Sequence, residues 1–293
     1  MISDLIKGVG TALITPFQSN GAIDTEALER IVELQLQANI DFLVVLGTTG
    51  ETATMTAGEQ QNIRRTIVFK NHGQVPLVLG MGGNCTKELV ERINLLSEEL
   101  KRNYAAILTV CPYYNKPNQE GLYRHFAAVA EISPIPVILY NVPGRTGVNM
   151  LPETVVRLAA NFPHKIAGIK EASGNRAQIQ EIIERTKGSE FFVLSGDDGL
   201  AAPLMHDGAH GLISVLSNAL PKQTMKLVHD KDLNMQEKLN PLIDLLFKEG
   251  NPTGIKALMA LQGTITNRLR LPLVEASNEL NAAIKTTLNN LAL

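Results

Sequence analysis

The sequence predicts an α/β fold, a (β/α)8 or TIM barrel with a C-terminal helical appendage, and three observations indicate it. About eight short apolar runs rich in β-branched residues recur along the chain, and helical patterns follow them. Their hydrophobicity is continuous rather than alternating, which is typical of parallel strands covered on both faces. Two successive runs end near Tyr140 and Lys170, and this separation of about 30 positions matches one βα unit.

The expected strands end in small or polar residues, which suit the loops that connect a strand to a helix. In chain order the apolar runs and their ends occupy residues 10–17, 42–50, 75–84, 104–115, 136–147, 166–173, 191–199 and 211–218. Eight strands that alternate with helices favour a closed barrel over an open doubly wound sheet.

Local signals mark where several intervening helices begin. Asp24 can cap the helix that follows it, and Pro152 suits the first turn of another. Asn84 or Thr86 can cap a helix over residues 87–100. These signals place helices between the expected strands, as the barrel requires.

The C-terminal part of the chain, from about Asp230, has helical patterns and no strand-like run. Helices are expected within residues 234–250 and 277–293. We therefore expect a catalytic barrel over residues 1–229 and a helical region over residues 230–293 that packs on it. No low-complexity linker separates the two parts.

Composition excludes several classes of protein. The formal net charge of -2 gives no basic field that would neutralise phosphates, so a nucleic-acid partner is not expected. The N-terminus lacks the features of a secretory signal, and the longest apolar runs are too short to span a membrane. Cys85 and Cys111 form no CxxC pair. We expect a reduced, cytoplasmic protein without a disulfide framework or a zinc site.

The chemically distinctive residues collect at the ends of the expected strands, where a (β/α)8 barrel carries its active site. They are Thr48, Thr49, Tyr113, Tyr114, Tyr140, Arg145 and Lys170. Taken singly, each could be an ordinary turn, core or surface residue. Their convergence at one end of the barrel favours a catalytic site.

Lys170 closes an apolar strand, where burying an ammonium group is expensive. Period-two alternation places Lys170 on the same face as Gly168, which would leave room beside it, and turns Glu171 the other way. Tyr140 ends the preceding strand, about 4.8 Å away if the two strands are neighbours. A neutral amine in such a place is a nucleophile for a carbonyl group.

A lysine that forms a Schiff base needs a proton shuttle. The phenol of Tyr140 can exchange a proton if Thr48 and Tyr114 relay it. The GTTGE loop, Gly47 to Glu51, offers N–H groups and hydroxyls to an anion such as a carboxylate. Arg145 can hold a second carboxylate in a bidentate manner.

Two other sequence patterns give little evidence of a binding site. GMGGN does not contain the full GxGxxG pattern, so it does not indicate dinucleotide binding. His206 and His210 have the spacing of a helical metal pair, but Gly208 lies between them and a strand follows at once, so no metal site is expected.

Four motifs together carry a resemblance over essentially the whole chain: GTTGE, the YYN of CPYYN, YNVPGRTG and GIKEASGN. In this order and spacing they resemble the class I pyruvate-dependent aldolases, the superfamily of N-acetylneuraminate lyase and dihydrodipicolinate synthase. YNVP followed by GRTG resembles the dihydrodipicolinate synthase family in particular. The resemblance implies a lyase that condenses pyruvate with L-aspartate 4-semialdehyde, the first committed step towards diaminopimelate and lysine.

The resemblance also implies the role of each site residue. Lys170 would form the imine with pyruvate and Tyr140 would be the general acid and base. Thr48 and Tyr114 would complete the relay, with Tyr114 reaching into a neighbouring subunit. The residues implied to bind substrate are Thr49, the main chain of Ile213 and nearby Gly196 for pyruvate, and Arg145 for the carboxylate of the semialdehyde. No metal or organic cofactor would be needed.

Members of this family usually form homotetramers, dimers of dimers, and some bind lysine as a feedback inhibitor. The residues that match the lysine pocket are Thr52, Ala53, Ala57, Gln60, Asn84, Glu88 and Tyr113. Lysine-sensitive members commonly carry histidines where this chain has Ala57 and Gln60. The resemblance therefore implies weak or absent inhibition by lysine.

Two alternatives remain open at this point. A related enzyme of the N-acetylneuraminate lyase or 2-keto-3-deoxygluconate aldolase type would cleave a 2-keto acid through the same imine, although such enzymes generally lack the arginine at the position of Arg145. A silent paralogue would keep the barrel as a ligand-binding module. It would have lost the lysine, the tyrosine or a relay hydroxyl, and none is lost here.

Overall fold

The eight predicted strands are present in a computed structural model that describes residues 2–291. They are β1 Gly8–Ala12, β2 Phe42–Val45, β3 Leu77–Gly80, β4 Ala106–Val110, β5 Val137–Asn141, β6 Ile166–Glu171, β7 Phe192–Ser195 and β8 Gly211–Ser214. Their order is that of a closed barrel, β1 to β8 in sequence, and the fold class predicted from the sequence is confirmed. The strands are shorter than the apolar runs because each run continues into the loop after its strand.

The strands are buried along almost their whole length. Every residue of β2, β5, β6, β7 and β8 is buried, and the apolar residues of these strands belong to the core. This pattern explains the continuous hydrophobicity of the runs, because both faces of each strand are covered.

Helices separate the strands, with short 3-10 turns in several loops. The α-helices are α1 Ile2–Leu5, α2 Thr25–Gln37, α3 Ala57–Asn71, α4 Thr86–Leu95, α5 Ser97–Asn103, α6 Gln119–Ile132, α7 Pro143–Thr146, α8 Pro152–Asn161, α9 Arg176–Thr186, α10 Ala201–His206, α11 Pro221–His229, α12 Leu233–Lys248, α13 Thr253–Leu261 and α14 Asn278–Asn290. The 3-10 turns are η1 Thr48–Gly50, η2 Thr52–Thr54, η3 Asp198–Leu200 and η4 Leu216–Asn218.

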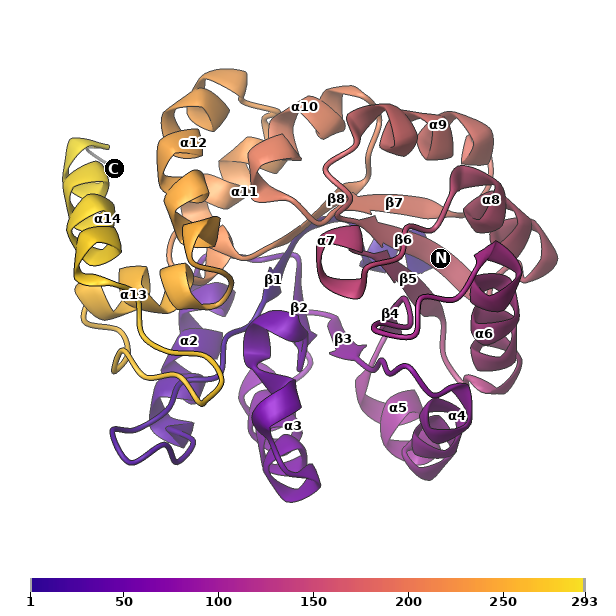
Figure 1. Cartoon of the computed structure of the whole chain (residues 1–293), viewed down its shortest axis with the longest axis horizontal. Coiled ribbons are helices and arrows are strands. Elements are labelled where there is room, and N and C mark those ends of the chain that lie inside the picture. The colour runs from indigo at the N-terminus through magenta and orange to yellow at the C-terminus, as the bar shows by residue number, and fades with distance from the viewer. Residues whose placement is uncertain (1, 292–293) are drawn as a thin grey trace. The chain divides into compact units, whose positions relative to one another are not determined.

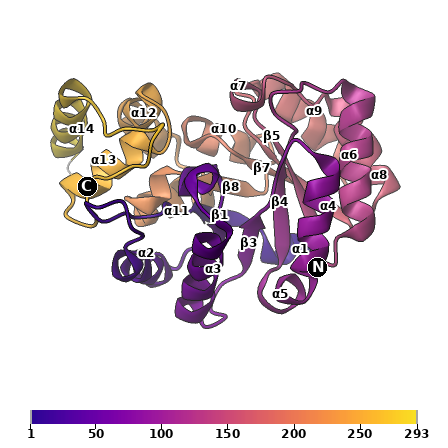
Figure 2. The ribbon, with the colours of Figure 1, turned by 60° about the horizontal axis from the view of Figure 1, so that its bottom comes forward.

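Two of the predicted helix starts are confirmed and one is wrong. The Asp24 carboxylate accepts a hydrogen bond from the Ala27 N–H at 2.9 Å, and Pro152 occupies the first position of α8. At the start of α4 the N-cap is Cys85, which makes no side-chain cap bond. The Thr86 hydroxyl instead pairs with Nδ1 of His125 at 2.9 Å, because α4 packs against α6. Figure 2 shows these two helices side by side.

Contacts along the chain group into two compact units. Among the described residues, one unit contains residues 2–8 and 76–213, and the other contains residues 9–75 and 214–291. Residues 214–229 therefore group with the C-terminal helices. The predicted boundary between a barrel and a helical region at residue 229 stays a prediction.

In the unit that contains β4 to β7, the strands pair in parallel and helices pack beside them. Figure 1 shows α6, α8 and α9 as successive neighbours, next to β5, β6 and β7. The pairing of β5 with β6 contains a register shift: Val137 pairs with Ile166, whereas Ile138 pairs with Gly168. The extra residue is Ala167, as in a β-bulge.

In the other unit, α12, α13 and α14 pack on one another, as their clustered orange and yellow ribbons in Figure 1 show. The prediction of a helical C-terminal region without strands is confirmed over the described residues up to 291. Among these described residues, no helix is long and apolar enough to cross a membrane.

Gly168 has a different role from the one predicted. A Cβ atom at this position would clash with the ring and the backbone oxygen of Phe192, which is fully buried in β7. The space that Gly168 leaves is therefore filled by Phe192 and is not free for a ligand beside Lys170. The glycine is required for the close approach of β6 and β7.

We expect Gly168→Ala to destabilise the protein by about 1–3 kcal/mol, because the added methyl group meets backbone that cannot move aside easily. Gly58→Ala is the matched control, because a Cβ atom at Gly58 in α3 would meet only Oγ1 of Thr56, at 4.0 Å. This substitution should change stability by less than about 1 kcal/mol. Urea denaturation of both variants measures the difference. Equal midpoints for the two variants would contradict this account of Gly168.

Candidate active site

Lys170 and Tyr140 lie opposite each other at the ends of β6 and β5. The two residues are register partners, and both side chains are buried, with 6% and 7% of their surface exposed. Nζ of Lys170 lies 4.3 Å from the centroid of the Tyr140 ring. The structure thus brings together the amine and the phenol that the sequence assigned to one site.

Gly196 adjoins Lys170 at the end of the next strand. A Cβ atom at Gly196 would lie 2.8 Å from Cε of Lys170 and 2.7 Å from Cβ of Ala172. Only a glycine leaves room here for the extended side chain of Lys170. This contact supports the expected position of Gly196 near the site.

Glu171 points away from Lys170, as predicted, and ends in a buried polar cluster. Its carboxylate accepts hydrogen bonds from Asn141 Nδ2 at 3.1 Å, from Gln178 Nε2 at 3.0 Å and from the Ser173 N–H at 2.8 Å. Gln178 belongs to α9, so this face of β6 is the helix-covered one. Lys170 therefore lies on the face of the sheet turned away from α9.

Burial raises the pKa of Glu171 and that of the neighbouring Cys111 thiol. Desolvation raises the pKa of the Glu171 carboxyl, and the hydrogen bonds from Asn141, Gln178 and Ser173 oppose that shift. The pKa of the buried Cys111 thiol is raised as well, first by desolvation and then by the nearby Glu171 charge. Cys111 is therefore a packing residue rather than a nucleophile.

The loops after β3, β4 and β5 are tied together by main-chain acceptors. Asn84 Nδ2 donates to the Tyr113 carbonyl at 3.1 Å, and Asn115 Nδ2 donates to the Asn84 carbonyl at 2.9 Å. The Tyr114 N–H donates to the Thr146 carbonyl at 3.4 Å. Asn84 and Tyr113 of the predicted lysine pocket are thus neighbours.

Tyr114 has an unusual backbone and an exposed side chain. Its φ of 73° lies in the left-handed region, which residues other than glycine seldom adopt. Its side chain is 88% exposed and makes no ring contact with Lys170 or Tyr140 in the described structure.

Arg145 lies in the four-residue helix α7, which directly follows β5 and begins with Pro143. The arginine side chain is exposed, in a helix that starts two residues after the end of β5. Glu88 of the predicted lysine pocket is exposed on α4. Ile213 is buried in β8.

The GTTGE loop belongs to the other unit and forms η1. Thr48 is exposed, whereas Thr49 is buried, with 3% of its surface accessible. The Thr15 hydroxyl donates to the Gly50 carbonyl at 2.8 Å, and Glu51 adopts a left-handed φ of 56°. The loop is therefore held in one conformation from both sides.

The remaining residues of the predicted lysine pocket lie just after this loop. Gln60 Nε2 donates to the Thr52 carbonyl at 3.3 Å. Ala53 and Ala57 are exposed. The amide of Gln60 is thus engaged by the main chain.

Three residues outside the sequence motifs hold the GTTGE loop. Lys256 forms a fully buried ion pair with Glu51, the Arg270 N–H donates to the same carboxylate at 3.1 Å, and Asn251 Nδ2 donates to the Thr49 hydroxyl oxygen at 2.9 Å. A signal for Lys256 was present, because TGIKALMAL places a lone lysine in an otherwise apolar helix. The other two carry no local signal.

One of the two histidines with this spacing, His210, is bound to the main chain. Nδ1 of His210 accepts a hydrogen bond from the Val193 N–H at 3.2 Å, which anchors the start of β8 to β7. Over residues 2–291, no group of three or more His, Cys, Asp or Glu side chains could hold a metal ion.

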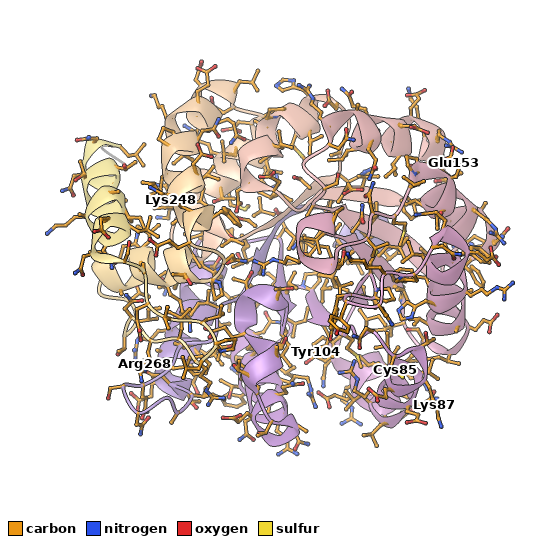
Figure 3. The ribbon with its side chains drawn as sticks, viewed as in Figure 1. Cys85, Lys87, Tyr104, Glu153, Lys248 and Arg268 are labelled. Carbon is orange, nitrogen blue, oxygen red and sulfur yellow. The ribbon has the colours of Figure 1, made fainter. Side chains whose placement is uncertain are left out.

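We expect Glu171→Ala to destabilise the protein by at least about 2 kcal/mol, because buried N–H groups that donate to the carboxylate lose their acceptor. Glu153→Ala is the control, since Glu153 lies on the outer surface of α8, where Figure 3 labels it, and pairs with Arg185 in solvent. Urea denaturation compares the two. A Glu171→Ala variant as stable as Glu153→Ala would show that the cluster does not stabilise this strand.

Comparison with known proteins identifies the family. The model of the "Dihydrodipicolinate synthetase family" matches residues 5–291. A 4-hydroxy-tetrahydrodipicolinate synthase of Parabacteroides distasonis is 48% identical over 276 residues, 92% of this chain and 91% of that protein.

Two solved structures are similar over almost their whole length. Dihydrodipicolinate synthase from Thermotoga maritima is 40% identical, with a TM-score of 0.93 over 98% of this chain and 99% of that chain. A monomeric dihydrodipicolinate synthase variant is also 40% identical, with a TM-score of 0.93 over 99% and 98% of the two chains. The chain therefore belongs to the dihydrodipicolinate synthetase family.

Proposed function

We propose that this protein is a lyase that condenses pyruvate with L-aspartate 4-semialdehyde to give 4-hydroxy-tetrahydrodipicolinate. This reaction is the first committed step of diaminopimelate and lysine biosynthesis. The observation that carries the proposal is the buried pairing of Lys170 with Tyr140 at the ends of two neighbouring strands. Membership of the family and the names of its curated relatives support it.

The amine of Lys170 is the nucleophile. Its lone pair attacks the ketone carbon of pyruvate to give a carbinolamine, and loss of water gives an imine. The phenol of Tyr140 gives a proton to the leaving hydroxyl and takes one back in later steps. The imine nitrogen acts as the electron sink, so the proposed reaction uses no metal and no organic cofactor.

Carbon–carbon bond formation follows from the imine. Loss of a methyl proton from bound pyruvate gives an enamine, whose carbon attacks the aldehyde carbon of the semialdehyde, and the aldehyde oxygen takes up a proton. The amino group of the second substrate then attacks the imine carbon. This attack closes the ring, and a proton passes from the attacking nitrogen to the lysine nitrogen. The bond to Lys170 then breaks, which leaves an imine in the ring and regenerates the free amine.

Thr48 and Tyr114 are proposed as the proton relay to Tyr140. Thr48 is exposed at the start of η1, and the side chain of Tyr114 projects into solvent. At 88% exposure, the ring of Tyr114 is accessible to a second molecule. This supports a homotetramer in which Tyr114 completes the relay of a neighbouring subunit.

The substrate carboxylates are assigned to two groups. Thr49 and the main chain of Ile213 hold the carboxylate of pyruvate, next to Gly196. Arg145 binds the carboxylate of the semialdehyde, since a guanidinium group can hold both of its oxygens. The position of each at or just after the carboxyl end of a strand supports these roles, because that end of a (β/α)8 barrel carries the active site.

We infer that the protein acts in the cytoplasm. Both cysteines are free thiols in the structure, Cys85 exposed and Cys111 buried. An exposed free thiol suits a reducing compartment.

Lys170→Ala is expected to abolish turnover and also the covalent adduct that borohydride traps in the presence of pyruvate. Tyr140→Phe should still form the adduct but lower kcat by about 10²- to 10⁴-fold, since it removes the proton donor. Turnover is measured with pyruvate and L-aspartate 4-semialdehyde, coupled to NADPH oxidation by dihydrodipicolinate reductase. Lys87→Ala, an exposed lysine of α4, is the control and should behave as the unmodified protein.

Failure would take two distinguishable forms. A protein that traps pyruvate on Lys170 but does not consume the semialdehyde would keep the imine and reject this pair of substrates. Release of pyruvate from sugar acids by that protein would then assign it to the sugar-acid aldolases. A folded protein that traps no pyruvate would reject the nucleophile itself.

We propose that lysine inhibits this enzyme weakly or not at all. The effector pocket would contain Thr52, Ala53, Ala57, Gln60, Asn84, Glu88 and Tyr113. Ala57 offers no polar group, and the amide of Gln60 already donates to the Thr52 carbonyl.

A titration with lysine up to 1 mM, a concentration on the order of weak protein–ligand affinities, should leave the initial rate nearly unchanged. The measurement is the same coupled assay at fixed substrate concentrations. The double variant Ala57→His, Gln60→His places histidines at both positions and should bind lysine more tightly. Submillimolar inhibition of the unmodified protein would refute the proposal.

A further inference from the structure

Asn251 contacts the GTTGE loop from a distant part of the chain. It lies two residues before α13 and is 202 positions away from Thr49 in sequence. Its Nδ2 group donates a hydrogen bond to Oγ1 of Thr49 at 2.9 Å, and both residues are buried. Asn251 lies outside all four sequence motifs of the site.

The direction of this hydrogen bond decides what the Thr49 hydroxyl can do. An amide N–H group can only donate, so the oxygen of Thr49 is the acceptor. The proton of the same hydroxyl is then left to donate to another group. A carboxylate is such a partner, since it only accepts.

The segment that carries Asn251 is fixed to the loop by charged groups as well. Lys256, one turn into α13, forms its buried ion pair with Glu51 and donates to the Arg268 carbonyl at 2.9 Å. The ammonium group lies 4.2 Å from the centroid of the Phe17 ring. Arg268, labelled in Figure 3, lies in the segment between α13 and α14.

Arg270 adds a second connection. Its main-chain N–H donates to Glu51, and its guanidinium group bonds to Glu59 and to the carbonyls of Gly21 and Thr54. Breaking a buried ion pair by removing one partner is strongly destabilising. The loop and the start of α13 are therefore held as one rigid piece, and Asn251 cannot easily move away from Thr49.

We propose that Asn251 is a positioning residue for pyruvate, which acts by fixing the Thr49 hydroxyl as a hydrogen-bond donor to the substrate carboxylate. This inference rests on the proposed function, in which Thr49 holds that carboxylate. It gives the C-terminal helical region a part in substrate recognition.

Two substitutions at Asn251 test the direction of the bond. Asn251→Asp replaces the donor by an acceptor of the same shape, so the Thr49 proton turns to the new carboxylate and is lost to the substrate. We expect KM for pyruvate to rise at least tenfold, with kcat changed less and KM for the semialdehyde unchanged. Asn251→Ala removes the donor without adding charge and should raise KM for pyruvate by a smaller factor, about threefold to fivefold, in line with a lost neutral hydrogen bond.

The Thr49→Val background tests whether Asn251 acts through the Thr49 hydroxyl. Asn251→Ala should have no further effect on KM for pyruvate in that background, because the hydroxyl that it positions is gone. The matched control is Asn234→Asp, the same chemical change at an exposed position of α12, which should leave all kinetic constants unchanged. Thermal unfolding of each variant shows whether it is folded at the assay temperature.

The outcomes are decisive in either direction. A rise in KM for pyruvate that disappears in the Thr49→Val background supports the proposal, and if Asn251→Asp does not fold, Asn251→Ala alone gives this result. Unchanged KM for pyruvate in folded Asn251→Ala, or an equal rise in the Thr49→Val background, overturns it. Failure of the proposed function is a separate result, since the unmodified protein would then not turn over pyruvate with the semialdehyde, whether or not it traps pyruvate on Lys170.

Discussion

The register between β5 and β6 is the constraint on which the reactive pair depends. The bulge at Ala167 shifts the pairing by one residue, so Tyr140 lies opposite Lys170 rather than opposite Ile169. Because side chains alternate between the faces of a strand, a slip of one residue would also turn the faces around. With the observed register, the pair of Asn141 and Glu171 forms on the helix-covered face, while the amine and phenol share the other.

Adjacent residues of β6 point to opposite faces of the sheet and have different roles: Glu171 stabilises the strand end, and Lys170 is the proposed nucleophile. Glu171 is held by hydrogen bonds from Asn141, Gln178 and Ser173, which satisfy a carboxylate that burial alone would disfavour. This fixes the strand end that carries Lys170. Phe192 fixes the same strand further back, where Gly168 allows it to approach. Lys170 can thus keep a defined position without a salt bridge to a carboxylate in its own strand.

The GTTGE loop depends on a different kind of support, a buried ion pair formed across 205 positions of sequence. Burial lowers the pKa of Lys256 to about 8, and the charge of Glu51 opposes that shift. Burying two charges costs desolvation free energy that offsets much of their attraction. The pair therefore adds little net stability, and its main effect is to define one geometry of the loop. The geometry it defines includes the left-handed turn at Glu51 and the buried hydroxyl of Thr49.

The sequence by itself determined the eight strands, their order, the helical C-terminal region and the placement of Lys170, Tyr140 and Thr49 at strand ends, because hydrophobic runs and turn residues are local signals. It failed where a distant partner competes, as when Thr86 bonds to His125 instead of capping α4. Only the tertiary structure decided the bulge at Ala167 and the contact of Asn251 with Thr49. Both arise from packing between segments far apart in the chain, and no local pattern of residues records which distant group a side chain will meet.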